Sequence, residues 1–160
     1  MLWIARQKVF IAMEVDVTTL DLDTWMFVRL LIAVVLGALV GYERERAGKP
    51  AGVRTHGMVS LGAALFAVVS MHGFGTTDDT ARVAAQIVTG IGFIGAGAIL
   101  HDRGGVHGLT SAASLWVTAA LGLAAGVGMV VISVGTTLLV FLLLRFGPRP
   151  GLKRGHACTE

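Results

Sequence analysis

The chain has 160 residues, of which 54% are hydrophobic and only 14% are charged, and its mean hydropathy is +0.76. This composition is too apolar for an ordinary soluble domain and argues against a water-soluble enzyme. The net charge of +3 does not predict nucleic-acid binding, because the basic residues flank apolar runs without an aromatic-basic patch. We therefore expect one small polytopic membrane domain, since spans of about 20 residues each use most of the chain.

Residues 1–24 contain apolar runs that are too short for a span or for a signal-peptide core. We assign them to an N-terminal extracytoplasmic segment, with Asp23 and Thr24 as the N-cap of the first helix. The first span follows at residues 25–42, where Arg29 snorkels from near the helix end. The transmembrane domain thus begins at residue 25.

Four further spans follow from stretches that are almost free of charged side chains. The last stretch, residues 104–144, is about twice as long as one crossing requires and must turn back, with Gly126 to Gly128 as the expected turn. The predicted spans are residues 55–77, 83–100, 110–125 and 129–146. The transmembrane domain then covers residues 25–146, and residues 147–160 form a short basic cytoplasmic tail.

Basic residues are distributed unevenly over the two sides of this arrangement. Nine lysines and arginines fall on the side of the 43–54 loop and the tail, whereas the other side has Arg6 and Lys8 and many of the acidic residues. Because the strongly basic side is normally cytoplasmic, we expect the N-terminus outside and the C-terminus in the cytoplasm. The predicted fold class is an all-α membrane protein, a compact bundle of about five transmembrane helices.

Residues 90–95 match the pattern GxGxxG of dinucleotide-binding loops, but their context differs from that of such loops. No strand is expected before them, and no acidic residue stands about 20 positions later. We attribute the glycines to helix packing, because a missing side chain lets a neighbouring backbone approach closely. The glycines expected to act in this way are Gly37, Gly41, Gly90, Gly92, Gly95 and Gly97.

The third predicted helix has one face with polar side chains at helical spacing. Its members are Arg82, Gln86, Thr89, Phe93 and Gly97. We expect this face to point inward, where the amide of Gln86 needs an interhelical hydrogen bond. A clasp between helices explains that bond, and a binding site stays open as the alternative. Asp79 precedes the helix and is expected to cap it.

The loop at residues 43–56 is the most concentrated polar segment of the chain. If the first helix continues through residue 47, side chains three or four apart pair there, namely Glu43 with Arg46 and Glu45 with Lys49. Gly48, Pro50 and Gly52 are then expected to reverse the chain.

Three carboxylates on this side, those of Glu43, Glu45 and Asp102, offer the oxygen ligands that Mg²⁺ prefers. The neighbouring arginines and lysine oppose cation binding, so we favour a charge-paired loop and leave a metal site open. None of the ten acidic residues falls inside a predicted span. This pattern argues against an ion path lined by buried carboxylates.

The four histidines near predicted membrane boundaries show no metal-binding spacing, and we expect them to be solvated at the interface. They are His56, His72, His101 and His107. Thr110, Ser111 and Ser114 open the fourth span and are expected to cap or clasp it, and Trp116 is expected to pack within the membrane. No serine has an evident activating base, so we predict neither an enzyme nor a cofactor.

Three segments carry a family resemblance: GYERERAGKPAGVRTH at residues 41–56, DTARVAAQIVTGIGFIGAGAIL at 79–100 and VHGLTSAASLWVTAALGLAAGVG at 106–128. In this order and spacing, from the first span to the fourth, they resemble the MgtC/SapB family of bacterial membrane proteins. The resemblance implies a multi-pass protein of the bacterial inner (plasma) membrane with about five helices.

The resemblance also implies a function. Family members are associated with growth under magnesium limitation and with virulence, and some act on other membrane proteins, notably by restraining the F-type ATP synthase. The candidate functional residues carried over by motif are Glu43, Arg44, Glu45, Lys49, Arg54, His56, Asp79, Arg82, Gln86, Gly92, Gly95, Thr110, Ser114 and Trp116. Thr80 departs from the family, which often has proline there. Roles of the soluble C-terminal domain of larger members are not carried over, because only residues 147–160 follow the last span.

We therefore expect a regulator that lies in the lipid bilayer and contacts other membrane proteins through small-residue helix faces. A transporter of magnesium or another small solute, or a subunit of one, is the alternative. No nucleic-acid partner is expected, and homo-oligomerisation stays open.

Overall fold

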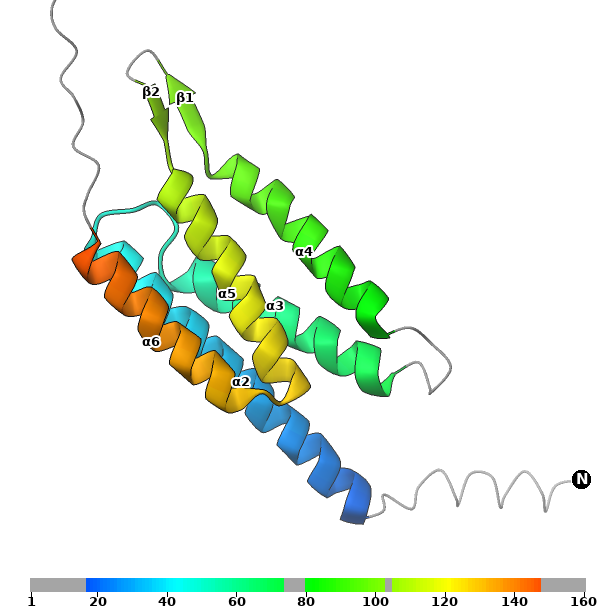
Figure 1. Cartoon of the computed structure of the whole chain (residues 1–160). Coiled ribbons are helices and arrows are strands. Elements are labelled where there is room, and N and C mark those ends of the chain that lie inside the picture. The colour runs from blue at the N-terminus through cyan, green and yellow to red at the C-terminus, as the bar shows by residue number, and fades with distance from the viewer. Residues whose placement is uncertain (1–16, 74–79, 103–104, 148–160) are drawn as a thin grey trace, which may run out of the picture.

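The computed structural model describes residues 17–73, 80–102 and 105–147 (Figure 1). This part of the chain contains five helices, as predicted, and one hairpin that the sequence analysis did not predict. The elements are α2 (Val17–Arg46), α3 (Val53–His72), α4 (Thr80–Gly97), β1 (Leu100–Asp102), β2 (Gly105–His107), α5 (Leu109–Val127) and α6 (Val130–Phe146).

Three of the helices are long and apolar enough to cross a membrane, over Asp21–Arg46, Val53–His72 and Leu109–Val127. The other two, α4 and α6, are shorter apolar helices. A helix of 17 residues such as α6 is about 26 Å long. That length is at the lower end of what a hydrocarbon layer of about 30 Å requires.

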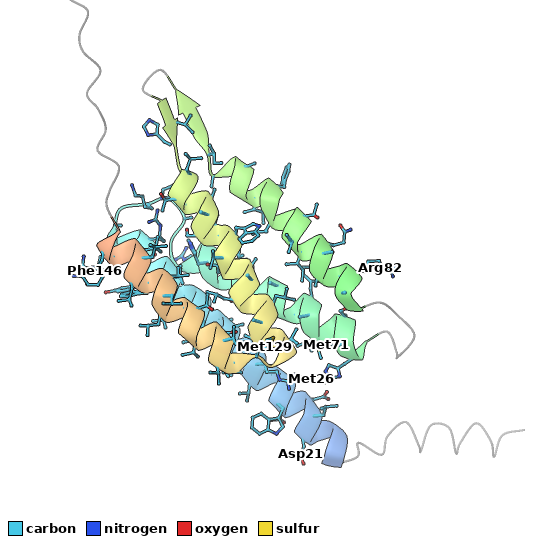
Figure 2. All side chains as sticks on the ribbon, viewed as in Figure 1. Asp21, Met26, Met71, Arg82, Met129 and Phe146 are labelled. Carbon is cyan, nitrogen blue, oxygen red and sulfur yellow. The ribbon has the colours of Figure 1, made fainter. Side chains whose placement is uncertain are left out.

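The helices α2, α3 and α5 pack against one another and form the centre of the bundle. Figure 1 shows α6 alongside α2 on one side and α4 on the opposite side, where α4 lies against α5 and α3. The first turns of α2, with Asp21, extend past the ends of the neighbouring helices (Figure 2). Because α4 is covered on one side only, most of its residues are exposed.

The interior contains small side chains, so the helix axes can approach closely. Ala33, Ala64 and Ala125 form one buried cluster at the contact of α2, α3 and α5. A second cluster, Ala63, Ile91 and Ala119, joins α4 to α3 and α5. The fold therefore depends on close backbone contact more than on large interlocking side chains.

Two glycines of α2 lie where α3 crosses it. A Cβ atom at Gly37 would stand 2.6 Å from the Cβ of Ser60, and one at Gly41 would stand 2.6 Å from the carbonyl oxygen of Gly52. Both distances are too short for real atoms, so only glycine permits this crossing. Ser60 strengthens the crossing, because its hydroxyl donates a 2.7 Å hydrogen bond to the carbonyl of Ala33.

The predicted start of the first helix is wrong. Asp23 and Thr24 were expected to cap it, but α2 is already helical from Val17, and both residues lie within it. No glycine or proline occurs between Val17 and Leu36, so nothing in this stretch terminates a helix once it has begun.

The predicted turn between the last two helices is confirmed. Helix α5 ends at Val127, and Gly128 adopts the left-handed conformation with φ of 98°. Its N–H donates to the carbonyl of Ala125, and that of Met129 donates to Ala124, so the free carbonyls of the helix end are satisfied. The unpredicted hairpin pairs Leu100 with His107 in antiparallel register and joins α4 to α5. Its three-residue strands are too short to show an alternating pattern.

Candidate functional site

A cluster of buried polar side chains lies where the end of α2 meets the starts of α3 and α5. We call it the polar clasp, and its members are Glu43, Arg44, His56, Ser111 and Ser114. Each is less than a tenth exposed. Since polar groups removed from water are costly unless they are hydrogen-bonded, their contacts decide how this end of the bundle is held together.

Arg44 connects α2 to α5. Its Nη2 donates a 3.1 Å hydrogen bond to the hydroxyl of Ser111, and its Nη1 lies 4.0 Å from the carboxylate of Glu43. Two buried atoms of this pair, Glu43 Oε2 and Arg44 Nε, have no hydrogen-bond partner among the residues that the structure describes. The ion pair therefore stays incompletely satisfied, although both side chains are almost fully buried.

His56 connects α3 to α5 and is fully buried. Its Nδ1 lies 3.0 Å from the carbonyl oxygen of Gly52, and its Nε2 lies 3.1 Å from the hydroxyl of Ser114. Because a carbonyl only accepts hydrogen bonds, Nδ1 must have the proton and donate it. Nε2 of the neutral ring then accepts the hydroxyl proton of Ser114, whose oxygen also lies 2.8 Å from the carbonyl oxygen of Ser111.

Each group of the clasp lies at the end or the start of its helix. Arg44 lies in the last turn of α2, and His56 lies in the first turn of α3. Ser111 and Ser114 are three residues apart at the start of α5, so both lie on one face of the helix, where Ser111 meets α2 and Ser114 meets α3. The resulting hydrogen bonds join the start of α5 to the end of α2 and to the start of α3, which lie 67 and 58 residues away along the chain.

Several expectations for this segment are wrong. His56 was expected to be solvated at the interface, yet it is buried because its helix crosses α2 at the glycines described above. Glu43 was placed outside the first span, but it lies in the helix Asp21–Arg46 and is 7% exposed. The expectation that no carboxylate would be buried in a span fails for this residue.

The predicted ion pairs of the loop are also wrong. Among the residues that the structure describes, Glu43 pairs with neither Arg46 nor another residue of the loop except Arg44. Glu45 accepts a 3.0 Å hydrogen bond from the backbone N–H of Val53 instead of pairing with Lys49. This contact places its carboxylate at the start of α3, where free amide groups need acceptors. The predicted chain reversal is confirmed, with Gly48 at a φ of 69°.

Helical spacing alone could have placed two of the clasp residues, Glu43 and Arg44, in the interior. The buried residues of α2 recur every three or four positions and so form one stripe along the helix. They are Ala33, Leu36, Val40 and Glu43, with Arg44 next to the last of them. Following the apolar stripe past residue 42 would have placed Glu43 and Arg44 in the interior. Sequence reasoning stopped at that residue because the first charged side chain was taken as the end of the span.

The described residues contain no group of three or more histidine, cysteine or acidic side chains that could hold a metal ion. Glu43 has a guanidinium beside it, and Glu45 is exposed and bonded to backbone. The clasp as it stands fastens helices, and its serines and histidine are engaged with one another and with backbone carbonyls.

A groove of about 700 Å³ runs between α3 and α4. Most of its lining is apolar, and Arg82 and Gln86 are its polar members. The groove is open because α4 approaches α3 through few residues, chiefly Ile87 and Ile91.

The predicted inward face of α4 is wrong. The residues assigned to it, Arg82, Gln86, Thr89, Phe93 and Gly97, are all exposed. The helix packs instead through Ile87, Ile91 and Gly95, which recur every four residues and are more buried. Apolar side chains form this contact because their burial is favourable and leaves no polar group without a hydrogen-bond partner. Within the described chain, Gln86 makes no interhelical hydrogen bond, and Thr89 bonds to the carbonyl of Ala85 in its own helix.

The predicted packing glycines divide into two groups. Gly37 and Gly41 lie at the close crossing of α2 and α3, and Gly95 makes an ordinary contact, 3.8 Å from Ala112. A Cβ at Gly90, Gly92 or Gly97 would meet nothing within 4 Å, so the expected close packing does not occur there. These three lie on exposed parts of α4, since the helix is covered on one side only.

The remaining candidates lie away from the clasp. Lys49, Arg54 and Thr110 are exposed, and Trp116 is half exposed on α5. Asp79 lies outside the described residues. The clasp thus unites Glu43, Arg44, His56 and Ser114 from the predicted set, and adds Ser111, whereas Arg82 and Gln86 belong to the groove.

Comparison with known proteins identifies bacterial relatives of this chain. Residues 30–150 match the MgtC family. The chain is 44% identical over 124 residues to the putative magnesium transporter YhiD of Escherichia coli strain K12, which covers 73% of this chain and 58% of that protein. It is 44% identical over 121 residues to protein MgtC of Salmonella typhimurium strain LT2, covering 72% and 51%.

An uncharacterized protein of Haemophilus influenzae is 37% identical over 132 residues, covering 77% of this chain and 56% of that protein. The chain thus spans little more than half the length of these relatives. No solved structure matches it. The family match and the apolar helices together make the chain a membrane protein.

Proposed function

The chain belongs to the MgtC family, and we propose that it is a non-enzymatic membrane regulator connected with magnesium homeostasis, acting by contact between α4 and a helix of another membrane protein. It lies in the bacterial inner membrane, which its five helices cross. Its partner is a multi-pass membrane protein, and the F-type ATP synthase is the partner that the family resemblance implies.

The outer face of α4 is the observation that carries this proposal. We define it as Ala85, Thr89, Gly92, Phe93 and Ala96, all of which are exposed and none of which lines the groove. Small residues at this spacing let another helix approach closely in a membrane. Phe93 stands out from the face and is 86% exposed. The hydroxyl of Thr89 is already bonded within α4, so a helix docked there leaves it satisfied.

The interior of the bundle supports a regulator over a transporter. Ser60 and Ser133 are buried and donate their hydroxyls to backbone carbonyls of neighbouring helices. Thr118 and Thr137 are buried and donate to carbonyls of their own helices. The two bonds between helices fasten the bundle, and all four hydroxyls are neutral, whereas Mg²⁺ is usually bound through one or two carboxylates. The two buried apolar clusters of the described core consist of alanines and Ile91, which offer no ligand to an ion.

The decisive experiment is photocrosslinking in native membranes. A benzoylphenylalanine at position 93, on the outer face, is compared with one at Leu139, which is 67% exposed on α6. We expect position 93 to capture one reproducible membrane protein and position 139 to capture none. Gly92→Leu, which fills the outer face, should abolish the capture. Recovery of no specific neighbour, or of this chain alone, would contradict the proposal.

A magnesium transporter is the second candidate, and the buried carboxylate of Glu43 is the observation that favours it. One relative is named a putative magnesium transporter. The guanidinium of Arg44, 4.0 Å from that carboxylate, opposes a divalent cation there. Purified protein in sealed vesicles separates the two: a regulator moves no Mg²⁺, whereas a transporter moves it in proportion to the amount of protein.

A further inference from the structure

The groove between α3 and α4 has the shape of a binding site and not merely of a gap between helices. It holds about 700 Å³, within the range of about 300–1,000 Å³ that is usual for small-ligand sites. Its two walls each include a glycine, Gly62 on α3 and Gly90 on α4, beside which there is open space. Ala63 and Ala119 form part of its lining, so small side chains keep it open.

The apolar lining indicates what kind of ligand the groove takes. A narrow, flexible hydrocarbon chain fits it, and the apolar walls formed by Val59, Phe66 and Ile87 match such a chain.

The charge at one end of the groove indicates which headgroup the bound hydrocarbon chain carries. Arg82 lies in the first turn of α4, at the end of the bundle where α3 finishes near Met71 (Figure 2). Gln86 follows one turn later, and both side chains line the groove. No acidic residue is among the described residues that line the groove, where the guanidinium adds a positive charge to an otherwise apolar surface.

We propose that this groove binds one anionic phospholipid, with its phosphate beside Arg82 and Gln86 and one acyl chain along α4 toward Ile94. Ile94 lies 12 positions after Arg82 on α4, a distance of about 18 Å along the helix axis. One leaflet of the hydrocarbon core is about 15 Å thick. The groove is thus long enough for one acyl chain of a lipid in the leaflet on the Arg82 side. The lipid enters the groove laterally from the bilayer.

This site is separate from the outer face of α4 that carries the proposed function. Gly90 and Gly92 are two positions apart on the same helix, both have open space at the Cβ position, and they point into the groove and onto the outer face respectively. Leucine at one position should therefore block the lipid, and leucine at the other should block the protein partner. The two proposals can fail independently.

Lipid retention by the full-length purified protein tests the site. The protein is reconstituted in vesicles of equal parts palmitoyl-oleoyl phosphatidylglycerol and phosphatidylcholine, extracted in mild detergent and examined by native mass spectrometry. We expect one retained lipid per chain, with about a five-fold preference for phosphatidylglycerol, the factor for one arginine beside an anionic lipid. Arg82→Gln should remove the preference, whereas Arg145→Gln, an exposed arginine of α6 outside the groove, should keep it.

The leucine pair tests the groove itself. Gly90→Leu should lose the retained lipid, and Gly92→Leu should keep it. Helicity is measured for both by circular dichroism, and if Gly90→Leu fails to fold, Gly62→Leu on the opposite wall replaces it. Equal retention of both lipids by the unmodified protein, or the same preference in Arg82→Gln as in Arg145→Gln, overturns the proposal. Retention that Gly90→Leu leaves unchanged also overturns it.

A photoreactive lipid tests the orientation. Phosphatidylglycerol with a diazirine at the end of one acyl chain should label peptides that contain Met58 or Ile94, at the end of the groove away from Arg82. Labelling spread evenly over α2 and α6 would mean that only the general lipid surround was sampled, and the proposed site would be rejected.

Discussion

Replacing Gly41 by alanine should separate α2 from α3 at the crossing that supports the polar clasp. The new Cβ would stand 2.6 Å from the carbonyl oxygen of Gly52 and 2.7 Å from the Cα of Val53. Both neighbours are backbone atoms and cannot rotate away. The start of α3 must therefore move by about 0.8 Å to restore an ordinary contact of 3.4 Å.

The change in the free energy of unfolding caused by Gly41→Ala follows from two opposing effects. Overpacking of this kind costs about 1–3 kcal/mol, and alanine regains up to about 1 kcal/mol of helix preference over glycine. The movement also strains two contacts at the same place, the bond from Val53 N–H to Glu45 and the bond from His56 to the carbonyl of Gly52. We expect a net loss of about 1–2 kcal/mol in the free energy of unfolding.

The assay is unfolding in detergent micelles, followed by circular dichroism against a matched variant. Gly135→Ala in α6 is the control, because a Cβ there meets nothing within 4 Å and the helix preference is the same. The control should be neutral or slightly stabilised. If Gly41→Ala is as stable as Gly135→Ala, the close crossing of α2 and α3 is refuted.

Three further substitutions test the clasp and the groove. Arg44→Met leaves a buried carboxylate without its cation and should lower the free energy of unfolding by about 3–5 kcal/mol. Arg54→Met, at an exposed position, should change that free energy by no more than about 0.5 kcal/mol. Equal effects of the two substitutions would contradict the burial of Arg44. Ser114→Ala removes the partner of His56 and should cost about 1–3 kcal/mol in the same measurement, and no loss would mean that this bond contributes nothing. Gln86→Leu should leave unfolding unchanged, since the side chain is exposed, but should reduce phosphatidylglycerol retention; unaltered retention would remove Gln86 from the headgroup contact.

The number of helices and the last turn could be predicted from the sequence because both depend on local properties. Apolar runs separated by polar loops indicate helices whatever their neighbours are. The left-handed conformation at Gly128 favours glycine for steric reasons that act within one residue. The hairpin between α4 and α5 escaped prediction, because strands of three residues leave no periodic signal.

The candidate site could be predicted only in part, for a different reason. The sequence placed Glu43, Arg44, His56 and Ser114 in polar segments, but His56 and Ser114 are 58 residues apart and nothing local indicates that they meet. The face of α4 was assigned wrongly because spacing shows which residues share a face and not which face finds a neighbour. Gln86 looked costly in lipid, whereas the structure leaves it at an open groove.

Composition and hydropathy by themselves determined that this chain is a helical membrane protein, since the solvent preference of each segment is a property of its own side chains. Only the tertiary structure decided that an arginine, a glutamate and a histidine are buried together and that α4 stands apart on one side. Those outcomes depend on how closely helices can approach, which the glycines and alanines of several segments set jointly.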